Sequence, residues 1–319
     1  MNSRRQALAF IAGASCVQAN AQSSATPLRL MVPFTPGTGI DLIARTLGPR
    51  LSQRLNRPVV VENRAGASGN IGTEAVVRAA PDGSTLLVSV NTLVMNRSLY
   101  PQLNFDPVTD LEPVSQTSWG QLLLVTHPQS GMKTATDLVQ AARQRPGQIN
   151  YASPGVGTPH HLSMEMFKNT AKLFVVHIPY RGTGPAVTDL LGGQVDTMFL
   201  PIHVALPHIR SGRLIALAIG SNKRNPLLPD LPTVSETGLN GYDVSVWFGA
   251  FAPAGLAPAL VSRISNALMN AANDPVVSEK LIQQGFVVKI LRPAEFSGFV
   301  RDEISKWTKV VRQAGIKAE

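Results

Sequence analysis

Short apolar runs and polar turns alternate along the chain, and their spacing predicts strands and helices in turn. In the first third of the sequence, apolar runs bounded by turn-forming residues predict strands at 28–34, 59–61 and 85–90. Between the first two runs, apolar residues recur at helical spacing over residues 40–55 and predict an amphipathic helix. Pro49 lies inside this pattern and is expected to kink the helix.

The first third of the sequence also contains a predicted helix at 71–80. The alternation of strands and helices then continues to the C-terminus. It predicts strands at 122–126, 149–152, 174–179, 195–200, 214–219, 244–251 and 287–290. It predicts helices at 71–80, 136–145, 160–168, 185–191, 204–211, 258–272, 275–284 and 293–314. Strands that alternate with helices favour parallel sheets covered by helices on both faces.

The order of these elements predicts that the chain leaves one α/β domain, builds a second and then returns to the first. The proposed crossings are the strands at 122–126 and 244–251. The first domain then comprises residues 27–122 plus 248–319, and the second comprises residues 123–247. Because ligands bind beyond the carboxyl ends of strands in open α/β sheets, we expect a ligand cleft between the two domains.

The N-terminus has the three parts of a secretory signal peptide in the required order. Arg4 and Arg5 precede an apolar run at residues 7–17, and an Ala-Asn-Ala cleavage site ends at Ala21. We therefore expect residues 1–21 to be removed, by either the general or the twin-arginine route. Cys16, the only cysteine, would leave with this segment, so the exported protein would contain neither a disulfide nor a thiolate.

Composition and charge exclude several classes of protein. The chain has 319 residues, of which 44% are apolar and only 15% charged, which is unlike a long disordered protein. Its formal net charge is +9, but the basic residues are scattered, which favours a solvated surface over nucleic-acid binding. The sequence has neither paired cysteines nor a His-Glu-x-x-His motif, so we expect no metal site and no cofactor.

Two Gly-rich loops, each between a predicted strand and a predicted helix, are the strongest candidates for a binding site. They are Pro36-Gly37-Thr38-Gly39-Ile40-Asp41 and Ser153-Pro154-Gly155-Val156-Gly157-Thr158. Glycine lets the backbone approach a ligand, and the free N–H groups at a helix start favour an anion. Neither loop has the spacing of a P-loop or a dinucleotide fingerprint, so we expect a small anion. An ordinary tight turn stays the alternative for each loop taken alone.

Other side chains follow predicted strands and are candidates for the same cleft. They are Asn91, Thr92, His161, Tyr180, Arg181, Asp196 and Phe199. Asn91 and Thr92 offer an amide and a hydroxyl group, although a helix cap is an equal alternative. Arg181 could pair with a carboxylate, or lie solvated in its loop. Asp196 could select an amino or hydroxyl group of a ligand. It could equally cap a backbone segment or pair with Arg181.

The sequence resembles the Bug family of periplasmic receptors, the substrate-binding components of tripartite tricarboxylate transporters, in several segments. The likeness covers nearly all of the chain after the signal peptide. The segments are Val-Pro-Phe-Thr-Pro-Gly at 32–37 with Asp41, Val-Val-Val-Glu-Asn-Arg-Ala-Gly at 59–66 continuing to Gly72, Ala-Pro-Asp-Gly-Ser-Thr-Leu-Leu at 80–87, Pro-Tyr-Arg-Gly at 179–182 continuing to Asp196, Leu-Pro-Thr-Val-Ser-Glu at 231–236, and Phe-Ala-Pro-Ala-Gly at 251–255.

This resemblance implies a type II-like, two-domain α/β periplasmic binding protein that closes on a small carboxylated solute. In the family, the first Gly-rich loop and the Ser-Pro-Gly-x-Gly loop grip the ligand carboxylate from opposite domains, partly through ordered water. Thr38 stands where glycine is common in the family. The resemblance also implies a monomer that delivers its ligand to membrane transporter subunits or to a sensor protein. It does not imply which carboxylate is bound.

The alternative function is that of an exported serine hydrolase. Ser153 could act as the nucleophile with His160 or His161, which follow it closely in sequence. A hydrolase would turn its substrate over and lose activity in a Ser153→Ala variant. A binding protein would leave its ligand unchanged and gain thermal stability from it.

Overall fold

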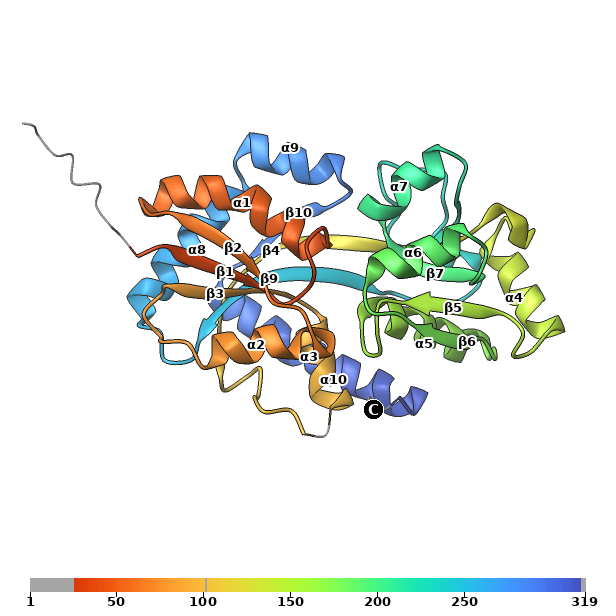
Figure 1. Cartoon of the computed structure of the whole chain (residues 1–319), viewed down its shortest axis with the longest axis horizontal. Helices are drawn as coiled ribbons and strands as arrows, with labels where there is room; N and C mark the ends of the chain where they lie inside the picture. Colours follow the sequence, from red (N-terminus) through yellow and green to blue (C-terminus); the bar gives the residue numbers. More distant parts are fainter. Residues whose placement is uncertain (1–25, 101, 317–319) are drawn as a thin grey trace, which may run out of the picture.

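The computed structural model describes residues 26–100 and 102–316. The predicted signal peptide, residues 1–21, lies outside the described residues. Figure 1 shows two lobes joined by two long neighbouring strands, β4 (Leu111–Thr126) and β9 (Ser245–Pro253). None of the described helices has the length and hydropathy needed to cross a membrane.

The first lobe, on the left of Figure 1, has a sheet in the strand order β2-β1-β3-β9-β4. Its other strands are β1 (Leu28–Val32), β2 (Val59–Asn63), β3 (Thr85–Val90) and β10 (Val287–Leu291), which pairs with β4. Strands β1, β2 and β3 are parallel, whereas β9 is antiparallel to both β3 and β4. The helices of this lobe are α1 (Gly39–Leu55), α2 (Asn70–Val77), α3 (Thr92–Leu99), α8 (Pro258–Ala272), α9 (Pro275–Gln283) and α10 (Pro293–Ala314).

The second lobe contains the far half of β4. From Leu122 onward, β4 stops pairing with β9 and pairs antiparallel with two strands of the second lobe. The strands of this lobe are β5 (Asn150–Ser153), β6 (Val176–Pro179), β7 (Thr197–Pro201) and β8 (Ile215–Ile219). Its helices are α4 (Ala135–Gln144), α5 (Pro159–Ala171), α6 (Thr183–Leu191) and α7 (Ile202–Arg210). Strand β5 is parallel to both β6 and β7, so these strands end at the same edge.

Most predicted strands and helices are present within a few residues of their expected bounds, but three expectations are corrected. The sheets are mixed, because β4 and β9 run antiparallel to their neighbours. Strand β4 begins at Leu111, well before residue 122, because its polar residues 115–118 are buried and hide the apolar pattern. Helix α3 was not expected at all. Helix α1 includes Pro49 in its interior, and the kink expected there stays a prediction. The domain boundaries proposed from the sequence stay a prediction.

A buried carboxylate joins β9 to α10 in the core of the first lobe. The indole nitrogens of Trp247 and Trp307 both donate to Oε2 of Glu303, each at 3.0 Å. Both indole rings are fully buried, and Glu303 is only 8% exposed. This arrangement satisfies two buried donors with one acceptor, which fixes the C-terminal helix against the crossing strand.

Candidate functional site

A cavity of about 520 Å³ is lined by loops from both lobes. On the first lobe its walls come from the loop after β1, the loop after β2 and the start of α3. On the second lobe they come from the loops after β5, β6 and β7. The crossing strands contribute Gly120, Gln121, Leu122, Val246 and Phe248. The cavity therefore lies where the carboxyl ends of the parallel strands meet, as expected for a ligand site in α/β folds.

Six helices have their N-termini at this cavity: α1, α2, α3, α5, α6 and α7. Five of them, all except α5, have no side-chain hydrogen bond at the N-cap. The first N–H groups of a helix lack intrahelical acceptors and carry the positive end of the helix dipole. The combined arrangement makes the cavity favourable for an anion.

The charged side chains reinforce this preference. Among the described residues that line the cavity, Arg181 is the only side chain that is charged near neutral pH, and none is an aspartate or glutamate. A carboxylate would therefore meet one cation and many N–H dipoles. An ammonium group would meet no counter-charge in the lining.

Asp41 holds the first Gly-rich loop together from outside the cavity. Its carboxylate accepts hydrogen bonds from the Gly37 N–H at 2.9 Å, from Arg45 Nε at 3.0 Å and from Asn63 Nδ2 at 2.9 Å. Burial disfavours the ionised form, but these hydrogen bonds outweigh it and keep the pKa of Asp41 below its usual value. The Gly37 N–H is thus used within the protein, whereas Gly39 and Ile40, at the start of α1, line the cavity and the N-cap makes no side-chain hydrogen bond.

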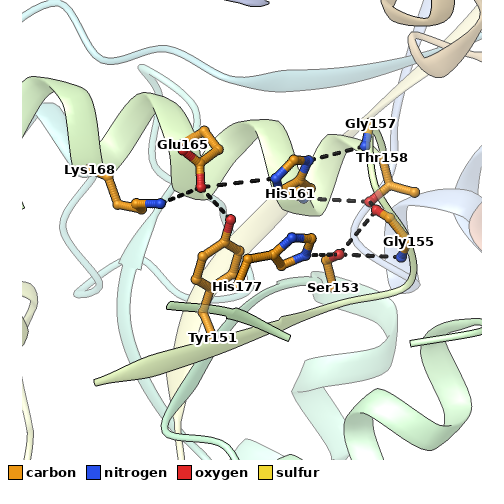
Figure 2. A network of polar contacts seen from close by, with 9 residues as sticks. All are labelled: Tyr151, Ser153, Gly155, Gly157, Thr158, His161, Glu165, Lys168 and His177. Atoms are coloured by element: carbon orange, nitrogen blue, oxygen red, sulfur yellow. Dashed lines mark hydrogen bonds and ion pairs between the residues drawn. The ribbon is translucent and has the colours of Figure 1, made fainter. Parts of the chain in front are cut away.

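Side chains that do not line the cavity also hold the second Gly-rich loop, and Figure 2 shows their contacts. Ser153 Oγ lies 2.6 Å from Nε2 of His177 and donates to the Gly155 carbonyl oxygen at 3.0 Å. The N–H of Gly155 donates to Ser153 Oγ at 3.2 Å, and that of Gly157 donates to Nδ1 of His161 at 3.0 Å. These two N–H groups are therefore used within the protein, and the predicted role of Gly155 and Gly157 in ligand binding stays a prediction.

Three stacked rings, those of His161, His177 and Tyr151, lie beside this loop. The ring centroids of His161 and His177 lie 4.1 Å apart, and those of Tyr151 and His177 lie 4.7 Å apart. The Tyr151 hydroxyl donates to Glu165, which also pairs with Lys168. Burial, with a smaller effect of the Lys168 charge, lowers the pKa of His161 to about 4. His161 is therefore neutral near pH 7, as it must be to accept the Gly157 N–H.

The two lobes touch through their Gly-rich loops. Ser68, in the loop after β2, donates from Oγ to the Val156 carbonyl oxygen at 2.7 Å. Asn96 on α3 donates to the Ser68 carbonyl oxygen at 3.0 Å. A Cβ at Gly157 would lie 2.5 Å from Leu99 Cδ1, which shows how closely this loop approaches α3. The structure thus joins the loop after β5 directly to the first lobe.

The sequence-predicted residues divide into those that line the cavity and those that support it. The lining residues are Gly37, Thr38, Gly39, Ile40, Thr92, Gly155, Thr158, Tyr180 and Arg181. Outside the lining are Pro36, Asp41, Asn91, Ser153, Val156, Gly157, His161, Asp196 and Phe199. Asp196 accepts the Asn150 N–H at 2.8 Å and so holds β5 near β7. Phe199 is fully buried in the core against Phe167 and Tyr242.

Sequence reasoning missed a substantial part of the lining. The missed residues include Phe34, residues 65–69, Gln121, His160, residues 201–204, Phe248 and Phe286. The loop at 65–69 is Gly-rich and joins a strand to a helix, so the rule applied to the other two loops would have found it. Phe248 and Phe286 carry no comparable local signal.

The geometry gives no support to the hydrolase alternative. Ser153 contacts His177 and not His160 or His161, so the expected pairing is wrong. Ser153 is fully buried and outside the cavity lining. Its hydroxyl donates to the Gly155 carbonyl oxygen within its own loop. These contacts give Ser153 a role in holding the loop.

We expect the free energy of unfolding to fall on acidification between about pH 6.5 and pH 4. Burial is the main cause that lowers the pKa of His160 and His177 to about 3, and that of His161 and His203 to about 4. An unfolded histidine titrates near 6.5, so in this range the unfolded chain binds more protons and acid favours unfolding. Each histidine that takes up a proton only on unfolding contributes up to about 1.4 kcal/mol per pH unit.

Denaturant unfolding at pH 7.5, 6, 5 and 4.5 measures this dependence. A His161→Asn variant removes one titrating ring and should show a shallower fall between pH 6.5 and 5. Constant stability from pH 7 to pH 4.5 would contradict the burial of neutral histidines.

We expect Gly157→Ala to weaken ligand binding about tenfold, or about 1.4 kcal/mol. Gly157 has φ +77°, and an added Cβ would overlap Leu99 Cδ1. Leu99 is buried in the core, so either its side chain or the loop must shift, and a shift of the loop displaces the start of α5. Gly131→Ala is the matched control, because Gly131 has φ +75° but open space around it. Calorimetry that gave both variants the affinity of the unaltered protein would refute the role of this loop contact.

Comparison with known proteins identifies relatives along the whole described chain. A family model described as the tripartite tricarboxylate transporter family receptor matches residues 43–316. Protein BugT of Bordetella pertussis is 39% identical over 295 residues, covering 92% of this chain and 90% of BugT. The solved structure of the periplasmic binding protein BugD superposes with a TM-score of 0.85 at 32% identity, covering 92% of this chain and 99% of BugD.

Two further solved structures are similar and carry ligands. An R. palustris protein solved with adipate has a TM-score of 0.87 and 32% identity, covering 92% of this chain and 98% of that protein. MatC of Rhodopseudomonas palustris, solved with bound malate, has a TM-score of 0.81 and 31% identity, covering 89% of this chain and 99% of MatC.

The fold and the cavity define a two-domain α/β periplasmic binding protein, which confirms the predicted fold class. The family match and the relatives then settle the narrower assignment. This chain belongs to the tripartite tricarboxylate transporter receptor family, which includes the Bug proteins. The resemblance drawn from the sequence segments is therefore confirmed.

Proposed function

We propose that this protein is a periplasmic receptor that binds one small carboxylate in the cavity between its lobes and leaves it chemically unchanged. The observation that carries the proposal is the meeting of six helix N-termini at a cavity whose described lining contains no acidic side chain. The adipate and malate bound by two structural relatives support a carboxylate ligand here.

We assign the carboxylate to the start of α1. The N–H groups of Gly39 and Ile40 have no intrahelical acceptors, and no side chain caps this helix. From the second lobe, the N–H of His160 at the start of α5 and the guanidinium of Arg181 complete the site. Because these groups come from both lobes, ligand binding favours the arrangement in which the lobes are together.

The proposal extends to the biological setting of the receptor. The chain is exported without residues 1–21, is a monomer and passes its ligand to membrane transporter subunits or to a sensor protein. It is not an enzyme, and its ligand is held without a metal. These statements rest on the family of binding receptors to which the chain belongs and on the signal-like N-terminus.

Thermal unfolding and native mass spectrometry test this function together. Native mass spectrometry of protein purified from its own cells should show a retained carboxylate of small mass. A small carboxylate that binds should raise the unfolding temperature, whereas its neutral amide should not. The mass of the ligand should stay unchanged after prolonged incubation, and EDTA should leave binding intact. Equal stabilisation by acid and amide, or turnover that Ser153→Ala abolishes, would overturn the proposal.

A further inference from the structure

One wall of the cavity is a cluster of aromatic rings that lies directly against the proposed carboxylate site. Phe248 and Phe286 are T-shaped with ring centroids 5.5 Å apart, and His203 packs on Phe286 at 5.0 Å. A Cβ placed on Gly39 would lie 3.0 Å from His203 Cε1 and 3.4 Å from Cζ of both phenylalanines. A ligand whose carboxylate binds at the start of α1 therefore places its adjoining atoms against these rings.

A further ring extends the apolar surface of the first lobe. Phe34 lines the cavity and packs against Gly69, where an added Cβ would lie only 3.1 Å from two of the ring atoms. Aromatic rings bind flat apolar groups well through stacked and edge-to-face contacts. A second carboxylate held against these rings would lose its hydration without gaining a charged partner there.

Two imidazoles, whose ring nitrogens are buried, bring polar atoms into this apolar region. Neither ring nitrogen of His160 or of His203 has a hydrogen-bond partner among the residues that the structure describes. Both side chains line the cavity. Burial lowers the pKa of each, and for His160 a nearby charge on His203 would lower it further, so both are neutral near pH 7. A neutral imidazole presents one donor and one acceptor.

A buried polar atom without a partner is costly, so the ligand is expected to satisfy these nitrogens. A neutral hydroxyl group complements them, because it can donate to one imidazole and accept from another. A second carboxylate would favour protonated imidazoles, which burial opposes. An ammonium group would find no acidic side chain in the described lining.

We propose that the ligand is an aromatic monocarboxylate that carries a neutral hydroxyl group, with the ring against Phe248 and Phe286 and the hydroxyl bonded to His160 and His203. This inference rests on the proposed function, since it places the carboxylate at the start of α1. The cavity of about 520 Å³ accommodates a molecule of one substituted ring.

Calorimetry with a matched series of acids tests the inference. The series is benzoate, 3-hydroxybenzoate, 4-hydroxybenzoate, terephthalate, cyclohexanecarboxylate, adipate, malate and glutamate. At least one hydroxybenzoate should bind ten times more tightly than benzoate and more tightly than every dicarboxylate and glutamate. Cyclohexanecarboxylate should bind more weakly than benzoate, because it lacks a flat ring.

Histidine variants identify the polar contact. His203→Phe and His160→Phe should each bring the ratio of hydroxybenzoate affinity to benzoate affinity close to one, whatever they do to benzoate binding itself. His208→Phe is the matched control, because His208 lies on the same helix as His203 but outside the cavity lining. It should leave the whole series unchanged.

The outcomes separate the inference from the proposed function. Tighter binding of adipate, malate, terephthalate or glutamate than of any hydroxybenzoate would overturn the inference and leave a carboxylate receptor in place. A hydroxyl preference that survives both cavity histidine variants would also overturn it. Failure of all eight acids to bind would overturn the inference but not the proposed function. A retained ligand without a carboxyl group would overturn both.

Discussion

The Gly39→Val protein is expected to fold and to bind its carboxylate ligand at least about 100-fold more weakly than the unaltered protein, a loss of about 2.7 kcal/mol. The Cβ would lie 3.0 Å from His203 Cε1 and 3.4 Å from the Phe248 and Phe286 rings. The two methyl groups would extend from there into the space beside the uncapped N–H groups of α1. Gly39 has an ordinary backbone conformation, so the substitution acts through occupied space and not through backbone strain.

Gly48→Ala is the matched control for this experiment. Gly48 lies on the same helix, and its added Cβ would meet only Val59 Cγ1 at 3.7 Å, an ordinary contact. It should keep full affinity in calorimetry and gain some helix stability. Circular dichroism and thermal unfolding check that the Gly39→Val protein is folded. A folded Gly39→Val protein with undiminished affinity would exclude the start of α1 as the anion site.

Replacement of Glu303 by leucine is expected to lower the free energy of unfolding by about 2–6 kcal/mol, because two buried donors are left unsatisfied. The indole N–H groups of Trp247 and Trp307 both donate to this carboxylate and would lose their only acceptor. Each buried donor left unsatisfied costs about 1–3 kcal/mol. Lys306, whose Nζ lies 3.5 Å from Glu303 Oε1, is partly exposed and loses little.

Two further variants test whether the stability loss of Glu303→Leu comes from the lost indole acceptor. Asp302→Leu removes the neighbouring acid on the same helix, where the side chain is exposed, and should change stability by less than about 0.5 kcal/mol. Glu303→Gln keeps an acceptor for the indoles and should cost less than Glu303→Leu. Urea unfolding measures all three proteins. If Glu303→Leu and Asp302→Leu were equally stable, the shared acceptor would not be holding α10 in place.

Local patterns predicted the individual elements well where one face of the element is apolar. The predicted helix at 258–272 has the bounds of α8, because its buried positions recur at helical spacing. Helix α3 escaped prediction because it is short and contains a buried polar residue, Asn96. The Asn96 amide donates to Ser68, in the loop after β2, and to Asn70 at the start of α2. The stability of α3 therefore depends on contacts far away in sequence.

Local patterns also fail to predict which single side chains of the candidate site face the cavity. His160 and His161 are adjacent, and helical neighbours point about 100° apart, so only one of them can face the cavity. The structure turns His160 to the cavity and His161 to the buried network with Gly157. The loop sequence contains both histidines and no local signal that distinguishes them.

By itself, the sequence determined the alternating α/β class, the two crossing strands and the two Gly-rich loops beside helix starts. These features depend on local apolar spacing and on turn chemistry, which the chain carries residue by residue. Only the tertiary structure decided that β4 and β9 run antiparallel to their neighbours, that the Gly157 N–H is already bonded, and that Phe248 and Phe286 form a cavity wall. Those outcomes depend on strand pairing and packing between residues far apart in sequence.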